Sequence, residues 1–192
     1  MKTAKHVQPC VVVLLAGLPG VGKTTLARAL APRINAEILR RDDIRDAIFP
    51  ESRLDFSAEQ NEVATRTLLD VLEYILQHKP PSAIVVDGKP FSQRREIDLV
   101  EQRVMACGAR LAIIHCVAPA EEITRRLQNG LQNPRNVRAE RNPEKAERIR
   151  REFEPIEGPH LELDTSRAFE DIVSTAIGYV GTCESHLDGT QV

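Results

Sequence analysis

The stretch Gly17-Leu-Pro-Gly-Val-Gly22-Lys23-Thr24 decides the fold of this 192-residue chain. It has the spacing GxxxxGK[ST], and it follows the apolar run from Cys10 to Ala16 and opens a segment of helical period. Glycines allow backbone angles that a side chain would forbid, so successive N–H groups can turn inward and form an anion-binding nest at the positive end of a helix. The pattern therefore predicts a phosphate-binding loop between a strand and a helix.

Side chains in and near this loop have separate expected roles. We expect the Lys23 ammonium to reach the β- and γ-phosphates of a nucleoside triphosphate, and the Thr24 hydroxyl to bind Mg²⁺. The apolar run Ala83 to Asp87 ends in an acid, which is the form of a Walker B element, and Asp87 is predicted to support the same metal. The predicted nucleotide-binding residues here are Gly17, Leu18, Pro19, Gly20, Val21, Gly22, Lys23, Thr24 and Thr25.

Length and composition fit one compact domain, which we place at residues 1–180, with 181–192 as a flexible tail. The 26 basic and 28 acidic residues give a net charge of −2, so only a local patch could bind nucleic acid. The cysteines are widely spaced and have no CxxC pair, which is typical of buried residues in a reducing cytoplasm. The apolar run near the N-terminus is too short for a targeting segment, and no other run approaches a membrane span. We therefore expect a cytoplasmic protein.

Apolar, β-branched runs alternate with segments of helical period, which indicates an α/β protein built of βαβ units around a parallel sheet. Strands are expected at Cys10 to Ala16, Ala36 to Leu39, Ala83 to Asp87, Leu111 to Val117 and His160 to Leu163. Helices are expected at Lys23 to Ala31, Ser57 to His78, Ser92 to Cys107, Pro119 to Gln128, Pro143 to Phe153 and Ala168 to Val180. In the second helix, a core-facing stripe is expected from Ala64, Leu68, Val71, Leu72 and Ile75. Asn142 before Pro143 predicts the start of the fifth helix.

A charged motif, Arg40-Arg41-Asp42-Asp43-Ile44-Arg45, follows the second expected strand. On a helix starting there, Asp42 and Arg45 share a face. The acid could take the proton of an acceptor hydroxyl or orient that hydroxyl, and the arginine could grip a phosphate or an acceptor anion. The plainer alternative is that Asp42 caps a helix and that Arg45 is solvated.

An arginine-bearing segment at about 129–142 has the composition of a mobile lid. It is rich in Asn and Gly, it carries Arg135, Arg138 and Arg141, and Arg125 and Arg126 come just before it. Cations on such a loop suit closure over a transferring phosphoryl group, which excludes water and offsets developing charge. We predict nucleotide contacts for Arg135 and Arg138. The plainer alternative is a solvated basic surface.

These motifs resemble those of small P-loop kinases, grouped as AAA-type ATP-binding proteins of the polynucleotide kinase and zeta-toxin kind, from Val11 to about Val180. The resemblance rests on GLPGVGKTT at 17–25, RRDDIR at 40–45, VVDGKPFSQRRE at 85–96 and PAEEITRRL at 119–127. It implies a P-loop NTPase fold with a five-stranded parallel sheet of order 2-3-1-4-5, ATP with Mg²⁺, and transfer to a hydroxyl. By position, Asp42 looks like the general base, Arg45 like the substrate-gripping arginine of the DDxxR motif, and Arg126 like the first lid arginine.

The sequence departs from that family in two places. Asp87-Gly88-Lys89 stands where polynucleotide kinases commonly have Asp-Thr-Asn, and Gly130 stands where a second lid arginine is expected. The second role must then move to Arg135, Arg138 or Arg141, or be absent.

The predicted function is transfer of the γ-phosphoryl group of ATP to a small hydroxyl-bearing molecule. One alternative is a 5′-hydroxyl nucleic-acid kinase, which the DDxxR motif favours and the net charge disfavours. The other is a regulatory ATPase without an acceptor, which would leave Asp42 and Arg45 unexplained.

Overall fold

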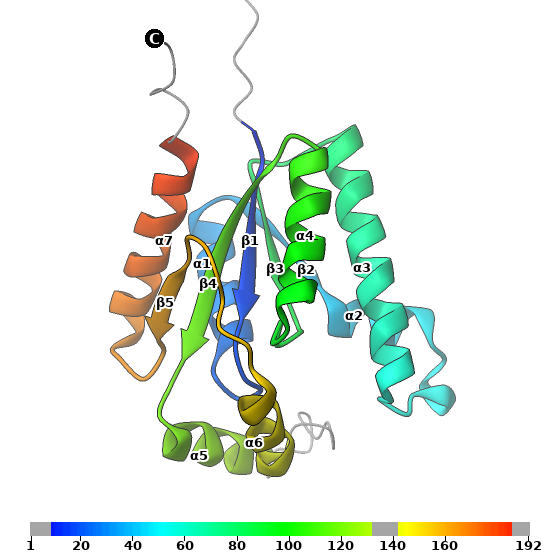
Figure 1. Cartoon of the computed structure of the whole chain (residues 1–192), viewed down its shortest axis with the longest axis vertical. Helices are drawn as coiled ribbons and strands as arrows, with labels where there is room; N and C mark the ends of the chain where they lie inside the picture. Colours follow the sequence, from blue (N-terminus) through cyan, green and yellow to red (C-terminus); the bar gives the residue numbers. More distant parts are fainter. Residues whose placement is uncertain (1–8, 132–141, 186–192) are drawn as a thin grey trace, which may run out of the picture.

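A computed structural model describes residues 9–131 and 142–185 and shows a parallel sheet with helices on both faces (Figure 1). The strands are β1 (Val11–Ala16), β2 (Ala36–Arg40), β3 (Ala83–Asp87), β4 (Arg110–Val117) and β5 (Leu161–Asp164). They form one five-stranded sheet in the order β2-β3-β1-β4-β5, and all neighbouring strands pair in parallel. The predicted α/β fold class and sheet order are confirmed.

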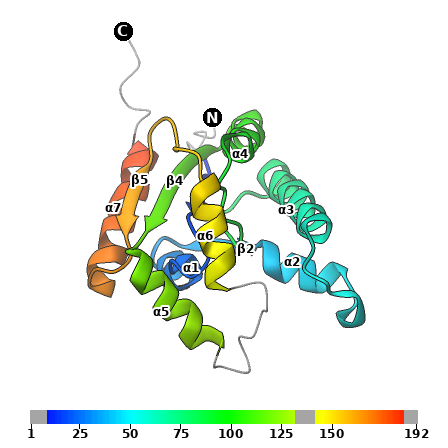
Figure 2. The same cartoon turned by 60° about the horizontal axis from the view of Figure 1, so that its bottom comes forward.

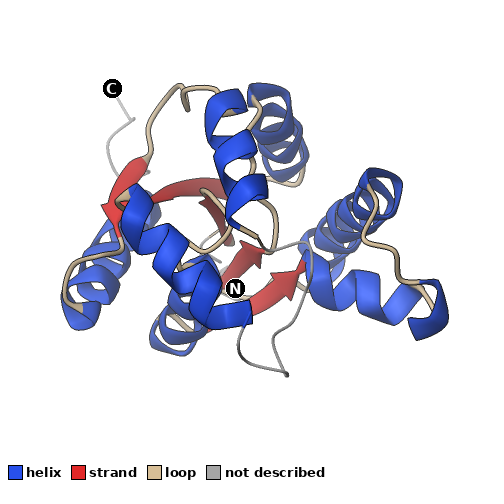
Figure 3. Ribbon diagram, turned by 90° about the horizontal axis from the view of Figure 1, so that it is seen from below, coloured by secondary structure: helices blue, strands red, loops and turns tan. Residues whose placement is uncertain are grey.

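Helices cover the sheet in two layers, with the strands between them (Figure 3). The helices are α1 (Lys23–Arg33), α2 (Arg41–Ile48), α3 (Ala58–His78), α4 (Arg94–Ala106), α5 (Ala120–Leu131), α6 (Pro143–Glu152) and α7 (Phe169–Ser185), with a short 3₁₀ turn at Glu51–Arg53. α5 and α6 lie beyond the end of the sheet to which the strand arrows point (Figures 1 and 2). The predicted elements are present, with ends that differ from prediction by a few residues.

The central strand β1 shows why strands of this sheet can have continuously apolar sequences. All six of its residues are buried, and they alternate between two cores. Val11, Val13 and Leu15 pack toward α1 and α7, whereas Val12 and Leu14 pack toward α3 and α4. A parallel strand that is covered on both faces has no polar side, so its sequence is continuously hydrophobic.

The expected core stripe of α3 is wrong at one position. Val71 is 37% exposed, and the buried apolar residues of the helix are Ala64, Leu68, Leu69, Leu72 and Leu76. Helical spacing places Val71 at the edge of this face, beyond the cover of the sheet and α4.

The last helix continues farther than predicted. We expected a flexible tail from Gly181, but α7 runs to Ser185, and Arg110 at the start of β4 donates a hydrogen bond of 2.6 Å to the carbonyl oxygen of Cys183. This contact ties the last turn of α7 to the sheet. Residues 186–192 lie outside the described part.

Within residues 9–131 and 142–185, no helix combines the length and the apolar character that a membrane span requires.

Candidate active site

The predicted phosphate loop lies between β1 and α1, where the carboxyl ends of the strands meet. Gly17 has φ +131°, and a Cβ there would overlap the carbonyl oxygen of Cys116 on β4, so no larger residue fits. The backbone N–H of Gly17 donates to the carbonyl oxygen of Pro90, 2.9 Å away, in the loop between β3 and α4. Gly22, with φ +103°, forms the N-cap of α1. The loop is thus held in shape by its neighbours on both sides.

Lys23 lies inside this loop. Its side chain is buried, and its ammonium donates to the carbonyl oxygens of Gly17 at 2.7 Å and Leu18 at 2.9 Å. Pro19 and Gly20 are half-buried beside it, whereas Thr25 is exposed on α1. The cation is therefore preplaced within the nest, while Thr25 stands at the surface.

The two predicted metal ligands are in contact. The Thr24 hydroxyl donates to Asp87 Oδ2 at 2.8 Å, and Arg40 Nε lies 3.3 Å from the same oxygen. Asp87 is fully buried, and its Oδ1 has no hydrogen-bond partner in the part of the chain that the structure describes. An unpaired buried carboxylate oxygen is costly unless a ligand or ion binds it. Hydroxyl and carboxylate oxygens are the ligands that Mg²⁺ prefers, so these residues fit this ion.

The charged motif spans the end of β2 and the start of α2, and Asp42 and Arg45 share a face of that helix, as predicted. Asp42 is 1% exposed and Arg45 is fully buried. Arg41 Nη2 donates to Asp42 Oδ1 at 2.9 Å, and Arg45 Nη1 lies 3.6 Å from that oxygen. The plainer alternative of a solvated Arg45 is wrong, because packing of α2 on α3 encloses it. The catalytic roles of the pair stay predictions.

Arg45 also has partners in α3 and in the segment before it. Arg45 Nη1 donates to Asn61 Oδ1 at 2.9 Å, and its guanidinium lies 4.5 Å from the centre of the Phe56 ring. Phe56 has φ +56°, a strained backbone conformation for an aromatic residue. These contacts favour a role for Arg45 in holding Asp42, alongside the predicted grip on substrate.

Arg126 approaches the phosphate loop from α5. Its guanidinium donates to the Val21 carbonyl oxygen at 3.0 Å, to the Thr165 carbonyl oxygen at 2.8 Å and to Glu122 at 2.7 Å. Hydrogen bonds from Arg125, and with them those from Arg126, hold the pKa of Glu122 below its ordinary value. Arg126 therefore contacts the phosphate loop at the Val21 carbonyl, and its predicted role in catalysis stays a prediction.

The other predicted lid arginines, Arg135, Arg138 and Arg141, lie outside the described residues. At the end of that segment, Asn142 Oδ1 accepts a hydrogen bond of 2.7 Å from the Lys145 N–H. The predicted N-cap of α6 is confirmed.

Thr165 and Arg40 are two further residues of the site, and no sequence motif predicted a role for either. The Thr165 hydroxyl donates to the Val21 carbonyl oxygen at 2.6 Å and so fastens the phosphate loop to the end of β5. Arg40 contacts both Asp87 and Asp43. Arg40 ends β2 and Thr165 directly follows β5. Open α/β sheets bind ligands at the carboxyl ends of their strands, so this rule could have indicated both residues.

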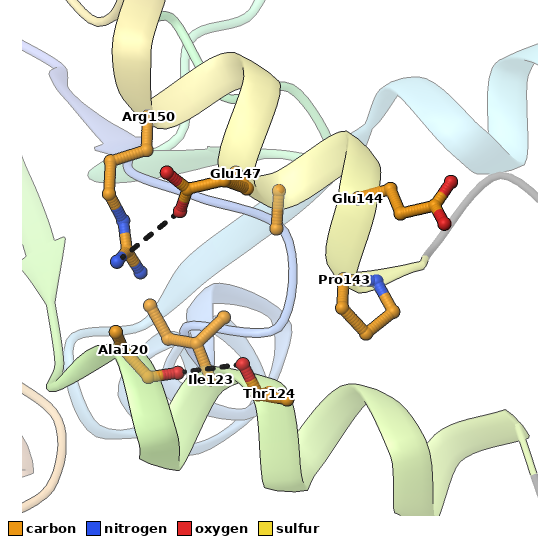
Figure 4. Close-up of a pocket in the computed structure, with 8 residues that line it drawn as sticks. Ala120, Ile123, Thr124, Pro143, Glu144, Glu147 and Arg150 are labelled. Carbon is orange, nitrogen blue, oxygen red and sulfur yellow. Dashed lines mark hydrogen bonds and ion pairs between the residues drawn. The ribbon is translucent and has the colours of Figure 1, made fainter.

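A cavity of about 340 Å³ lies between α5 and α6 (Figure 4). Its lining residues are Ala120, Ile123, Thr124, Pro143, Glu144, Ala146, Glu147 and Arg150. None of them belongs to the phosphate loop or to α2, so we assign this cavity no part in binding nucleotide or acceptor.

Comparisons with known proteins agree with this geometry. Residues 12–156 match the model of the AAA domain family. A putative kinase from Chloroflexus aurantiacus superposes with a TM-score of 0.68 at 20% identity, over 92% of this chain and 98% of that one. A gluconokinase from Sinorhizobium meliloti gives 0.68 at 15% identity, over 96% and 99% of the chains. The APS kinase of Mycobacterium tuberculosis, in complex with AMPPNP and APS, gives 0.66 at 18% identity, over 90% and 98%.

No curated protein matches the sequence. At these identities the structural likeness shows a shared fold, whereas the family match covers most of the chain and confirms the resemblance inferred from the motifs. The chain belongs to the AAA domain family and has the fold of the small P-loop kinases.

Proposed function

We propose that this protein is an ATP-dependent kinase that transfers the γ-phosphoryl group to a hydroxyl of a small molecule in the cytoplasm. One observation carries the proposal: a buried acid, Asp42, belongs to the same edge of the sheet as the phosphate loop. Arg40 pairs with Asp87 in the strand register and contacts its carboxylate, and α2 begins at the next residue. Because Asp87 also contacts Thr24, one chain of contacts runs from the phosphate loop to the helix that bears Asp42.

The nucleotide half of the reaction depends on the loop. Lys23 would exchange its two carbonyl partners for β- and γ-phosphate oxygens, while the backbone N–H groups hold the rest of the triphosphate. Mg²⁺ held by Thr24 and Asp87 would neutralise charge on the phosphates. Lys23 should lower the transition state more than it tightens binding, because charge develops on the transferring group.

The acceptor half depends on Asp42. The acceptor oxygen forms a bond to the γ-phosphorus as the bridging oxygen leaves with ADP, and we assign Asp42 to orient the acceptor hydroxyl and receive its proton. Arg41 and Arg45 hold one carboxylate oxygen in a fixed direction. In a loose transition state, orientation contributes more than proton removal, which suits a carboxylate fixed in this way.

Two neighbours support a small acceptor. The gluconokinase and the APS kinase are, by their names, enzymes of small molecules. The absence of a basic excess in this chain agrees with such an acceptor more readily than with nucleic acid.

The test is ATP consumption with a panel of sugars, sugar acids, nucleosides and 5′-hydroxyl oligonucleotides, with products detected by mass. The Lys23→Ala protein serves as the control. A phosphorylated small molecule that the wild type makes and the control does not make supports the proposal. A phosphorylated oligonucleotide would favour the nucleic-acid kinase instead, and slow ATP loss without a phosphorylated product would favour a regulatory ATPase.

A further inference from the structure

Arg41 and Lys89 come from the start of α2 and from the loop that packs against it, and the proposed chemistry assigns neither cation to the substrate. Arg41 opens α2, and its side chain is only 12% exposed. Its Nη2 donates to Asp42, but its Nε is buried and has no hydrogen-bond partner in the part of the chain that the structure describes. A buried N–H donor without an acceptor costs free energy, and such a group in a native fold calls for an explanation.

Lys89 is the second cation. It lies in the loop between β3 and α4, its side chain is 15% exposed, and its ammonium is 3.1 Å from Glu96 Oε1. This acid also serves α4, because the other oxygen of Glu96 accepts a hydrogen bond of 3.3 Å from the Gln93 N–H in a capping box. Lys89 therefore shares the Glu96 carboxylate with the N-terminus of α4.

The two cations come from neighbouring backbone segments. Gly88 has φ +105°, and a Cβ there would lie 3.1 Å from the Arg41 nitrogen and 3.3 Å from the Asp42 nitrogen. Glycine thus lets the loop that carries Lys89 pack directly against the start of α2. The contact brings a lysine, an arginine and the acid assigned to the acceptor hydroxyl into one region.

We propose that Arg41 and Lys89 bind an anionic group of the acceptor, so that the substrate is a small hydroxyl-bearing acid. Arg41 Nε offers a donor that a carboxylate, phosphate or sulfate oxygen can satisfy, and the Lys89 ammonium adds charge without fixed direction. A neutral polyol would add no negative charge to a region in which Asp42 is shared by Arg41 and Arg45, and in which Glu96 is shared by Lys89 and the start of α4. This inference rests on the proposed kinase function and names the class of its acceptor.

The experiment measures binding, so it is independent of turnover. Protein saturated with AMPPNP and Mg²⁺ is titrated calorimetrically with matched neutral and acidic compounds: sorbitol and gluconate, ribose and ribose 5-phosphate, adenosine and adenosine 5′-phosphosulfate. We expect at least one acid to bind about tenfold or more tightly than its neutral partner, as a charged hydrogen bond contributes. The pair that shows the preference tells whether the group is a carboxylate, a phosphate or a phosphosulfate.

Variants decide whether the two cations cause that preference. Lys89→Met and Arg41→Gln should each remove most of it, and Lys79→Met, at the exposed end of α3, should retain it. Circular dichroism verifies that each variant is folded, and two independent variants guard against misfolding of one. Equal binding of acid and neutral compound in every pair, or a preference that survives both variants, would overturn the inference. Neutral compounds that bind and are phosphorylated would also overturn it, while leaving the kinase function intact.

Discussion

The nucleotide half and the acceptor half of the candidate site differ in the groups that form them. The nucleotide half is mainly backbone: glycines, carbonyl groups and the start of α1, with Lys23 held by main-chain oxygens. The acceptor half is mainly side chains: Asp42 between Arg41 and Arg45, with Lys89 on the adjoining loop. A backbone nest is fixed by the fold and binds phosphate groups without regard to the base of the nucleotide. The ligand that a side-chain network binds can change with a few substitutions. A sequence motif therefore predicts the first half, whereas we expect the second half to determine which substrate is bound.

A large effect should come from Lys23, the charged side chain at the centre of the nucleotide half. Lys23→Ala should lower kcat by on the order of 10³, because a charge aimed at the transferring group is removed. The fold should survive, since the ammonium's contacts with the Gly17 and Leu18 carbonyl oxygens lie within the loop itself. Turnover near the wild-type rate in a protein with unchanged circular dichroism would show that the loop is not the catalytic phosphate site.

Thr24 and Asp87, the proposed Mg²⁺ ligands, link the two halves, and loss of either ligand should change the Mg²⁺ requirement. We expect Asp87→Asn to raise the Mg²⁺ concentration for half-maximal activity by about tenfold or more, because a ligand charge is lost. Asp43→Asn is a matched control, since Arg40 contacts both acids while Asp43 is 59% exposed. An unchanged Mg²⁺ titration for Asp87→Asn, or an equal shift for both variants, would remove Asp87 from the metal site.

A smaller effect is expected where the segment after α6 is fastened to the start of α4. Glu154 accepts a hydrogen bond of 2.6 Å from the Arg94 N–H, and its own N–H donates to the Ser92 carbonyl oxygen at 2.9 Å. Glu154→Ala should lower the free energy of unfolding by about 1 kcal/mol, as loss of a helix cap does. Glu157→Ala removes an exposed ion pair with the Arg94 side chain and should change it little. Chemical denaturation compares the two, and equal stability of both variants would show that this cap is without effect.

The sequence predicted those parts of the site that local pattern determines. A loop between an apolar strand and a helix, and Asp42 and Arg45 on one helical face, follow from spacing alone. The burial of Arg45 could not be predicted in this way, because it depends on Phe56 and on packing against α3. The hydrogen bond from Thr165 to Val21 joins residues that are 144 positions apart in the sequence, and no local pattern encodes such a contact.

We propose that Asp42 serves the acceptor and not the nucleotide, and measuring kcat together with the nucleotide Kd tests this role. With the acceptor found in the screen, Asp42→Ala should lower kcat by on the order of 10² to 10⁴, while Asp42→Asn retains more activity because it still orients the hydroxyl. Asp46→Asn is the matched control, since Asp46 also lies near Arg45, at 3.5 Å, but is 39% exposed, and it should cost far less. We expect a nucleotide Kd within about twofold of the wild type in all three variants, because no proposed nucleotide contact is removed and a change of about 1.4 kcal/mol would be needed for a tenfold shift. Wild-type kcat in both Asp42 variants, or a fall in kcat that is matched by an equal loss of nucleotide affinity, would contradict it.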